Sequence, residues 1–527
     1  DAMAGVDPGV TDTLAEVLTA GNTTTTDQKI QFRDTGIYIN SSADGQLDIV
    51  ADTEIQIAAT TIDIDGAINA SGEIIAASLD ISGDIDVDGT SNLDILDVDG
   101  AANFAADVTL ADGADLITAS AGTSNLRLGV NAGNSIVSGG NYNVVVGDEA
   151  GTALTTGDGN VAMGYAALDA EDTGQYNTAI GYYALSNQNN DTASYNTAVG
   201  SSAGLAVTTG TNNTLIGGLA GTAITTAANN TALGYASLSA NTTGASNVAL
   251  GSYALDANTT ASFNTGLGYF SLSGNTTGAL NTAVGRSSLE VNTTGGSNTA
   301  VGEQALVANT TASNNTAVGK SALGANTTGI DNVAVGAYAL DANTTAGYNV
   351  AVGRDALTGN TTGASNVAVG AYALDENTTA SFNTSVGQNS MGANTTGSSN
   401  VAVGEKALYF NTTASNNTAV GKSALTANTT GIYNTAVGSL SGDANTTANN
   451  NTSLGYASLS TAGGNQNTAL GSQSLFSNTA ANNTAVGYAA LFANTTASNN
   501  TAVGTSALTA NTTGDQNVAV GAGAGTA

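Results

Sequence analysis

The chain lacks several residue types on which most enzymes and small extracellular domains depend. Its 527 residues include no cysteine, no histidine and no tryptophan, and Pro8 is the single proline. Without cysteine there is no disulfide framework, thiol nucleophile or cysteine-bound zinc. Without histidine there is no His-based acid–base pair, Ser–His triad or common transition-metal site. These absences favour a non-enzymatic protein with no catalytic residues, no bound metal and no cofactor.

Positive charge is equally scarce. The chain has eight Lys and Arg residues and 41 Asp and Glu residues, which gives a net charge of −33. Such a chain repels nucleic acid and anionic membrane surfaces, and its acidity favours solubility. No apolar run approaches the roughly 18–20 residues of a membrane helix. We therefore expect no nucleic-acid partner and no membrane insertion. The chain begins at Asp1 without a recognisable signal peptide, so we expect a processed or truncated N-terminus.

The N-terminal part predicts two short regions. Residues 1–35 contain one amphipathic segment, 11–20, in which Leu14, Val17 and Leu18 share a face and which Gly21 can end, so we expect a helix in an attachment segment. Residues 36–124 alternate apolar and polar residues between Asp-Gly turns, which predicts an acidic, β-rich shaft.

One acidic turn of this shaft resembles the beginning of a calcium loop. Asp84, Asp86, Asp88 and Gly89 have the required spacing, but Ile95 stands where a bidentate Glu is needed. We therefore favour a solvated turn without metal.

Glycine is abundant, and from residue 125 to residue 527 it recurs with a fixed period. The unit is N-[TV]-A-V-G-x-x-A-L-x-A-N-T-T-[GA]-x-x, numbered here 1 to 17 from its Asn. The position-5 glycine recurs from Gly147 to Gly521 at 17-residue spacing, with one interval of 19 and two of 16. A short fixed period over almost 400 residues predicts an all-β, parallel β-solenoid or β-roll of about 23 coils.

The coil from Asn315 illustrates the expected role of each repeated residue. The β-branched residues at positions 2 and 4, such as Val318, predict a short strand, and we expect them to point into the coil. The nearly invariant Ala at position 3 is then expected to pack against another chain. Gly319 at position 5 is expected to need a positive φ or a close backbone approach. Asn suits stacked turns, because its amide can bond the backbone or the Asn of the next coil.

Positions 9 and 12 exchange volume. Position 9 is usually Leu, as in Leu323, and position 12 is then Asn, as in Asn326. Three coils with glycine at position 9 carry Leu, Val or Ile at position 12, in the pairs Gly151/Leu154, Gly204/Val207 and Gly221/Ile224. This exchange predicts that both positions border one tightly packed interior. Because a coil this thin buries few large side chains, we also expect several chains to associate.

At this point the repeat resembles known families. N-T-A-V-G-x-x-A-L is similar to the N-S-V-A-I-G-type repeat in the heads of trimeric autotransporter adhesins. The 17-residue unit with N-T-T-G turns, and the segment 13–24, more closely resemble bacteriophage tail fibres, especially of marine phages. The resemblance implies a homotrimer of parallel β-rolls. The adhesin unit is shorter than 17 residues, and this sequence shows no C-terminal membrane anchor or coiled-coil stalk, which weakens the adhesin hypothesis. It also shows no C-terminal self-cleaving chaperone domain, which is common on such phage fibres; removal of that domain would explain this departure from the tail-fibre pattern.

Aromatic residues decorate the variable positions of the coils and are the candidate contacts with a surface ligand. They follow the position-5 glycine. We expect them either to stack on sugar rings or to stack on one another as a ladder and pack between chains. The candidates are Tyr165, Tyr182, Tyr183, Tyr235, Tyr253, Tyr269, Phe270, Tyr338 and Tyr372.

Other motifs have weaker functional readings. The repeated Asn-Thr-Thr matches the glycosylation acceptor pattern but is better explained by turn chemistry. The acid pairs Asp148/Glu149 and Glu171/Asp172 could in principle cleave glycans, but adjacent strand residues point to opposite faces.

The leading hypothesis is therefore a structural fibre of a virion that is extracellular and attaches to a host-cell glycan or protein. We expect its N-terminus to contact other tail proteins. A cellular surface adhesin or extracellular filament with the same coils is the alternative. An ice-binding solenoid is a minor one, because no Thr-x-Thr is repeated on the strand.

Overall fold

The computed structural model describes residues 29–31, 38–40, 48–51, 54–57, 64, 67–68, 70, 121–461 and 463–526. The chain divides into two compact units, Asp1–Val108 and Thr109–Ala527, and each is described here by itself. All named elements within the described ranges are strands, and these ranges contain no helix. The helix expected at 11–20 and the acidic turn at Asp84 both lie outside the described residues.

The first unit contains a small antiparallel sheet of three strands. They are β1 (Lys29–Gln31), β2 (Tyr38–Asn40) and β3 (Asp48–Val50). β2 lies in the centre, where Ile39 pairs with Ile30 of β1 and with Ile49 of β3. β2 and β3 fall within two of the alternating segments that predicted a β-rich shaft.

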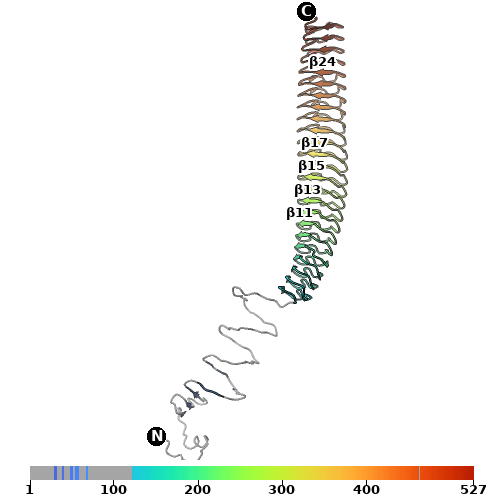
Figure 1. The fold of residues 1–527 in the computed structure, drawn as a ribbon. Helices are drawn as coiled ribbons and strands as arrows, with labels where there is room; N and C mark the ends of the chain where they lie inside the picture. Colours follow the sequence, from blue (N-terminus) through green and yellow to red (C-terminus); the bar gives the residue numbers. More distant parts are fainter. Residues whose placement is uncertain are drawn as a thin grey trace, which may run out of the picture. The chain divides into compact units, whose positions relative to one another are not determined.

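The second unit is a column of stacked coils, each of which contributes one three-residue strand (Figure 1). Successive strands are parallel and in register, so that Ala300 pairs with Ala317 and Ala317 with Ala334. Each strand between the first and the last therefore pairs with the strand one coil before it and the strand one coil after it. This confirms a parallel β-solenoid of about 23 coils with a 17-residue period.

The strands of the solenoid occupy positions 2 to 4 of successive units. They are β4 (Leu126–Leu128), β5 (Val144–Val146), β6 (Val161–Met163), β7 (Thr178–Ile180), β8 (Thr197–Val199), β9 (Thr214–Ile216), β10 (Thr231–Leu233), β11 (Val248–Leu250), β12 (Thr265–Leu267), β13 (Thr282–Val284), β14 (Thr299–Val301), β15 (Thr316–Val318), β16 (Val333–Val335), β17 (Val350–Val352), β18 (Val367–Val369), β19 (Thr384–Val386), β20 (Val401–Val403), β21 (Thr418–Val420), β22 (Thr435–Val437), β23 (Thr452–Leu454), β24 (Thr468–Leu470), β25 (Thr484–Val486), β26 (Thr501–Val503) and β27 (Val518–Val520).

The strand faces the opposite way from our expectation. The position-3 alanines, such as Ala317, are fully buried in the interior of the single chain, whereas Val318 at position 4 is 36% exposed. The expectation that positions 2 and 4 point inward and that position 3 contacts another chain was therefore wrong. The physical reason is width: Leu323 at position 9 already fills the interior, which leaves room for only a methyl group on the opposite wall.

The turns depend on backbone conformations that favour glycine. Gly319 has a φ of 134°, and a Cβ there would lie 2.6 Å from the carbonyl group of Gly336 in the next coil. This confirms both the positive φ and the close approach expected at position 5. Ser321, Leu323 and Asn314 also have φ between 53° and 63°. A left-handed residue costs about 1–2 kcal/mol, so complete burial of the Leu323 side chain must offset strain in its own backbone.

Two buried ladders of asparagine connect the coils. At position 1, the backbone N–H of Asn315 donates to the side-chain Oδ1 of Asn298, 3.0 Å away. At position 12, Nδ2 of Asn326 donates to Oδ1 of Asn309, 3.1 Å away. The side chains of Asn315 and Asn326 also both donate to the carbonyl oxygen of Gly329. The ladders therefore satisfy polar groups inside the column that would otherwise be costly to bury.

The predicted exchange of volume between positions 9 and 12 is visible in the interior. A Cβ on Gly221 would lie 2.8 Å from Cδ1 of Ile224, and a Cβ on Gly151 would lie 2.8 Å from Cδ1 of Leu154. The sequence reading missed a second contributor to the same space. Leu215, at position 3, would lie 2.7 Å from a Cβ on Gly221, so a large residue on the strand also fills the gap.

Candidate functional surfaces

The outward face of the strands forms a long surface without charge. From β5 to β27, positions 2 and 4 carry only Thr, Val, Leu, Ile or Met. These side chains are partly solvent-exposed; Val335 is 37% exposed and Leu454 is 48% exposed. Because the strands are in register, the exposed residues form two continuous rows along the column. We call this surface the strand face.

A second regular surface follows the Asn-Thr-Thr turns. At position 13 the threonine hydroxyl is fixed, because Oγ1 of Thr310 donates to the carbonyl oxygen of Thr327, 3.2 Å away. At position 14 every coil from Thr243 to Thr447 has an exposed threonine. In the same turns the Asn side chains at position 12 are fully buried. The side-chain nitrogen that would accept a glycan is thus buried inside the coil. This supports a structural role in the turn over glycosylation at these asparagines.

The candidate aromatic residues gather into two clusters on the edge formed by positions 6 and 7, which we call the variable edge. In the first, Tyr165 stacks on Tyr182 with ring centroids 5.5 Å apart, and both contact the edge of the Tyr183 ring. About half of the Tyr182 surface remains exposed, at 53%. The rings therefore support one another and still offer a face to solvent.

The second aromatic cluster spans three coils. Tyr253 stacks on Phe270 with ring centroids 5.1 Å apart, and Tyr235 and Tyr269 contact Tyr253 edge-on. Tyr338 and Tyr372 lie apart from both clusters; the guanidinium of Arg354 lies 5.7 Å from the centroid of the Tyr372 ring. The structure therefore brings together seven of the nine candidates. Two aromatic stacks were not among the candidates: Tyr176 on Tyr195 and Phe476 on Phe492.

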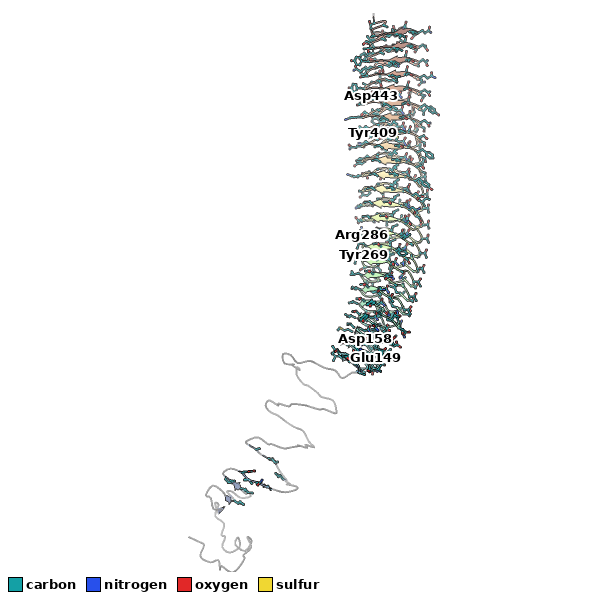
Figure 2. All side chains as sticks on the ribbon, in the orientation of Figure 1. Glu149, Asp158, Tyr269, Arg286, Tyr409 and Asp443 are labelled. Carbon is teal, nitrogen blue, oxygen red and sulfur yellow. The ribbon has the colours of Figure 1, made fainter. Side chains whose placement is uncertain are left out.

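The variable edge also holds most of the positive charge of the coils. Arg286, Lys320, Arg354, Lys406 and Lys422 all occupy position 6 or 7, and all are solvent-exposed. Figure 2 labels Tyr269 and Arg286 on successive coils. The sequence analysis did not identify this basic edge, although the repeat alone places these residues at positions 6 and 7.

Acidic neighbours neutralise much of this charge. Glu303 contacts Arg286 on one side, and Lys320 lies 3.7 Å away on the other. The hydrogen bond and charge of Arg286, with the charge of Lys320, hold the pKa of Glu303 below its usual value. Lys422 pairs in the same way with Glu405, at 3.2 Å. The basic residues are therefore exposed but mostly paired.

Burial desolvates Glu171 in the interior and several acidic residues at position 10. Burial raises the pKa of Glu171, which is fully buried at position 12 and whose Oε2 has no hydrogen-bond partner within the described coils. Burial, with the charges of Glu376 and Asp355, raises the pKa of Asp375 to about 6. Glu171 lies inside the coil rather than in a cleft, so the pair Glu171/Asp172 is not arranged as two carboxyl groups facing a substrate.

Three further observations bound the chemistry of the described residues. Within them, no three His, Cys, Asp or Glu side chains lie close enough together to hold a metal ion. No helix there is long and apolar enough to cross a membrane. Comparison with protein-family models, curated proteins and solved structures finds no match.

Proposed function

We propose that this chain is a structural fibre protein that associates with two further copies of itself through the strand face. The observation that carries the proposal is the complete absence of charge from this face in a chain with a net charge of −33. The position-4 row of this face is entirely apolar, and a long apolar surface on a soluble protein usually marks an interaction site. A second and third copy offer the same rows at the same period, so each coil can meet an equivalent coil. The number three rests on the resemblance of the repeat to trimeric fibres.

The energetics support self-association along the whole column. Burial of apolar surface contributes about 25 cal/mol per Å², so each partly exposed Val or Leu contributes a small amount. The rows repeat this contribution in coil after coil, and no charged group has to be desolvated. The strand face therefore replaces position 3 as the proposed contact between chains.

We further propose that the fibre is extracellular, belongs to a virion, and attaches to a host-cell surface without catalysis. The aromatic clusters on the variable edge are the proposed contact sites, because the rings of Tyr165, Tyr182, Tyr235 and Tyr269 remain about half exposed on a rigid support. Many equal sites on one rigid body can raise the avidity by about 10²–10⁴ over a single contact. Neutral glycans suit an acidic rod better than anionic ones, a host protein is the other partner class, and the N-terminal unit would contact other tail proteins.

Imaging tests the location. An antibody against the repeat, applied to particles and to cells, should label fibres on particles. Labelling confined to cell surfaces would replace the virion fibre with the cellular adhesin.

A binding experiment tests the proposed contact sites. The purified full chain is applied to an array of neutral and acidic surface polysaccharides, beside a variant with Tyr235, Tyr253, Tyr269 and Phe270 all changed to Ser. Loss of retention only in this variant supports the clusters. The matched control changes Tyr456 and Tyr488 to Ser, because these exposed rings lie outside both clusters. Equal retention of all three proteins would exclude the second cluster as the contact site.

Ice binding is the second candidate, and one observation favours it. The exposed position-14 hydroxyls from Thr243 to Thr447 make no hydrogen bond within the described coils, yet the residue is always Thr. Position 2, where only β-branched shape is required, accepts both Thr and Val. The hydroxyl row is thus constrained by something other than the fold. Thermal hysteresis of the purified chain is the test, and its absence removes this candidate.

A further inference from the structure

The interior of the solenoid is interrupted at one place. One apolar cluster runs from Ala132 to Ala436, and a separate cluster begins at Leu459. The interruption falls around β23 and concerns the coils between Gly438 and Gly471. No other division of the apolar interior occurs within the described coils.

Three buried serines occupy the interior at this place. Oγ of Ser441 lies 2.7 Å from Oγ of Ser453 and 3.0 Å from Oγ of Ser458, and all three residues are at most 2% exposed. Serines alone do not interrupt the core. Ser385 and Ser390 occupy the same two positions of another coil, and the apolar cluster continues through Met391.

The difference lies at position 9, where the interrupted coil has Gly442. Other coils with glycine at this position recover the volume from position 12 or position 3, as Ile224 and Leu215 do around Gly221. The coil of Gly442 keeps Asn445 at position 12, and Ser453 is the residue at position 3 of the next strand. The isobutyl group that Leu supplies in neighbouring coils is thus missing and is not replaced.

The position-12 asparagine ladder weakens at the same coils. From Asn258 to Asn428 the position-12 bonds measure 2.7–3.1 Å, but Nδ2 of Asn445 lies 3.4 Å from Oδ1 of Asn428. The position-1 ladder continues through these coils, because the backbone N–H of Asn451 donates to Oδ1 of Asn434, 3.0 Å away. Nδ2 of the buried Asn451 has no hydrogen-bond partner within the described residues, as is also the case for Asn177 and Asn500. The repeat also shortens here, because Gly455 and Gly471 are 16 residues apart. The gap in the packing, the lengthened position-12 bond and the shorter repeat therefore fall in the same coils.

We propose that the coils between Gly438 and Gly471 form a joint at which the column opens locally before any other part of coils 147–521. The joint divides the solenoid into a long N-terminal stack and a short C-terminal stack that can open independently. Because coils interact only with their neighbours, the loss of one coil interface releases the shorter stack without unfolding the longer one. In a fibre, this is the place where the column bends under load or where a protease first cuts it.

Hydrogen exchange of the native full chain tests the joint. Amides of residues 439–470 should exchange at least about tenfold faster than those of residues 285–336, which corresponds to about 1.4 kcal/mol in local opening. Limited proteolysis of the same protein should cut first within 439–470. Equal protection of the two segments, or a first cut elsewhere in the coils, would overturn the proposal.

Repair of the interior sharpens the test. Gly442→Leu combined with Ser453→Ala restores the residues of neighbouring coils, and the φ of 59° at Gly442 matches that of Leu elsewhere at position 9. The repair should slow exchange in 439–470 by at least about tenfold, with Gly442→Ala as a milder version. The matched control, Ser385→Ala with Ser390→Ala, removes buried serines from a coil that keeps its core and should leave exchange in 439–470 unchanged. Unchanged exchange in both repaired variants would contradict the joint.

Discussion

The coils of residues 200–233 and those of residues 285–336 have the same backbone conformation, but different side chains fill their interiors. Both have the glycine of position 5 at a φ between 130° and 138° and left-handed residues at positions 7 and 9. The earlier coils place Gly204 and Gly221 at position 9 and fill the space with Val207, Leu215 and Ile224. The later coils use Leu at position 9 and a ladder of Asn at position 12. The coil outline is therefore fixed by the turns, whereas its interior requires only a constant volume with satisfied polar groups.

The largest expected effect on stability comes from a change that reduces the volume of the side chains in the interior. Leu323→Gly should destabilise its coil by about 2–5 kcal/mol, because it removes a fully buried side chain, although relief of the left-handed backbone offsets part of the loss. Adding Asn326→Leu converts the coil to the filling of the earlier region and should recover part of the stability. Denaturant unfolding of the two variants measures this.

The double variant also breaks one rung of the Asn ladder, so recovery will be incomplete. Asn326→Leu alone is the control: it overpacks the interior and leaves Oδ1 of Asn309 without its donor, so it should be destabilising. If the double variant is no more stable than Leu323→Gly, positions 9 and 12 do not exchange volume in this region.

A smaller effect should separate the two sides of the strand. Ala317→Leu places three extra carbon atoms beside Leu323 and should cost about 1–3 kcal/mol. Position 3 accepts Leu215 only because Gly204 and Gly221 make room for it. Val318→Leu, one residue along and outward, should leave the unfolding midpoint nearly unchanged. Equal costs for the two variants would contradict the inward orientation of position 3.

The smallest effect should depend on pH. Burial raises the pKa of Glu171, so the folded state favours the protonated carboxyl group. For an acid whose pKa is higher in the folded state, stability is retained below the unfolded pKa and is lost as the pH rises through the folded pKa. Glu171→Gln should therefore raise the melting temperature at pH 8 and have little effect near pH 3.5. Gln188, at position 12 of the next coil, shows that the site accepts Gln. An equal change at both pH values would point to packing rather than ionisation.

Sequence reasoning predicted the architecture because the repeat is written in the chain. The period predicted the length of each coil, and the glycine of position 5 predicted the turn. The exchange at Gly221/Ile224 showed that positions 9 and 12 border the interior. Orientation of the strand could not be read in the same way. A Thr-Ala-Val strand has β-branched residues on one side and a methyl group on the other, and either side can face inward until the width of the interior is known.

The candidate surfaces were predicted less completely. The aromatic clusters were anticipated because Tyr253 and Phe270 differ by one period, but which rings touch depends on side-chain geometry. The joint was hidden for a different reason. The sequence already shows that Asn445 and Ser453 do not supply the volume missing at Gly442, but only the packing shows that the apolar interior is interrupted there.

Sedimentation of matched lysine variants tests the central claim, that copies meet at the strand face. We expect the full chain to sediment as a trimer. Val318→Lys, Val335→Lys and Val352→Lys together should reduce it to a monomer with unchanged circular dichroism. The control places three lysines on the variable edge, as Ala337→Lys, Ala371→Lys and Thr505→Lys, and should remain a trimer. A monomeric wild-type chain, or a strand-face variant that remains as trimeric as the control, would contradict the account.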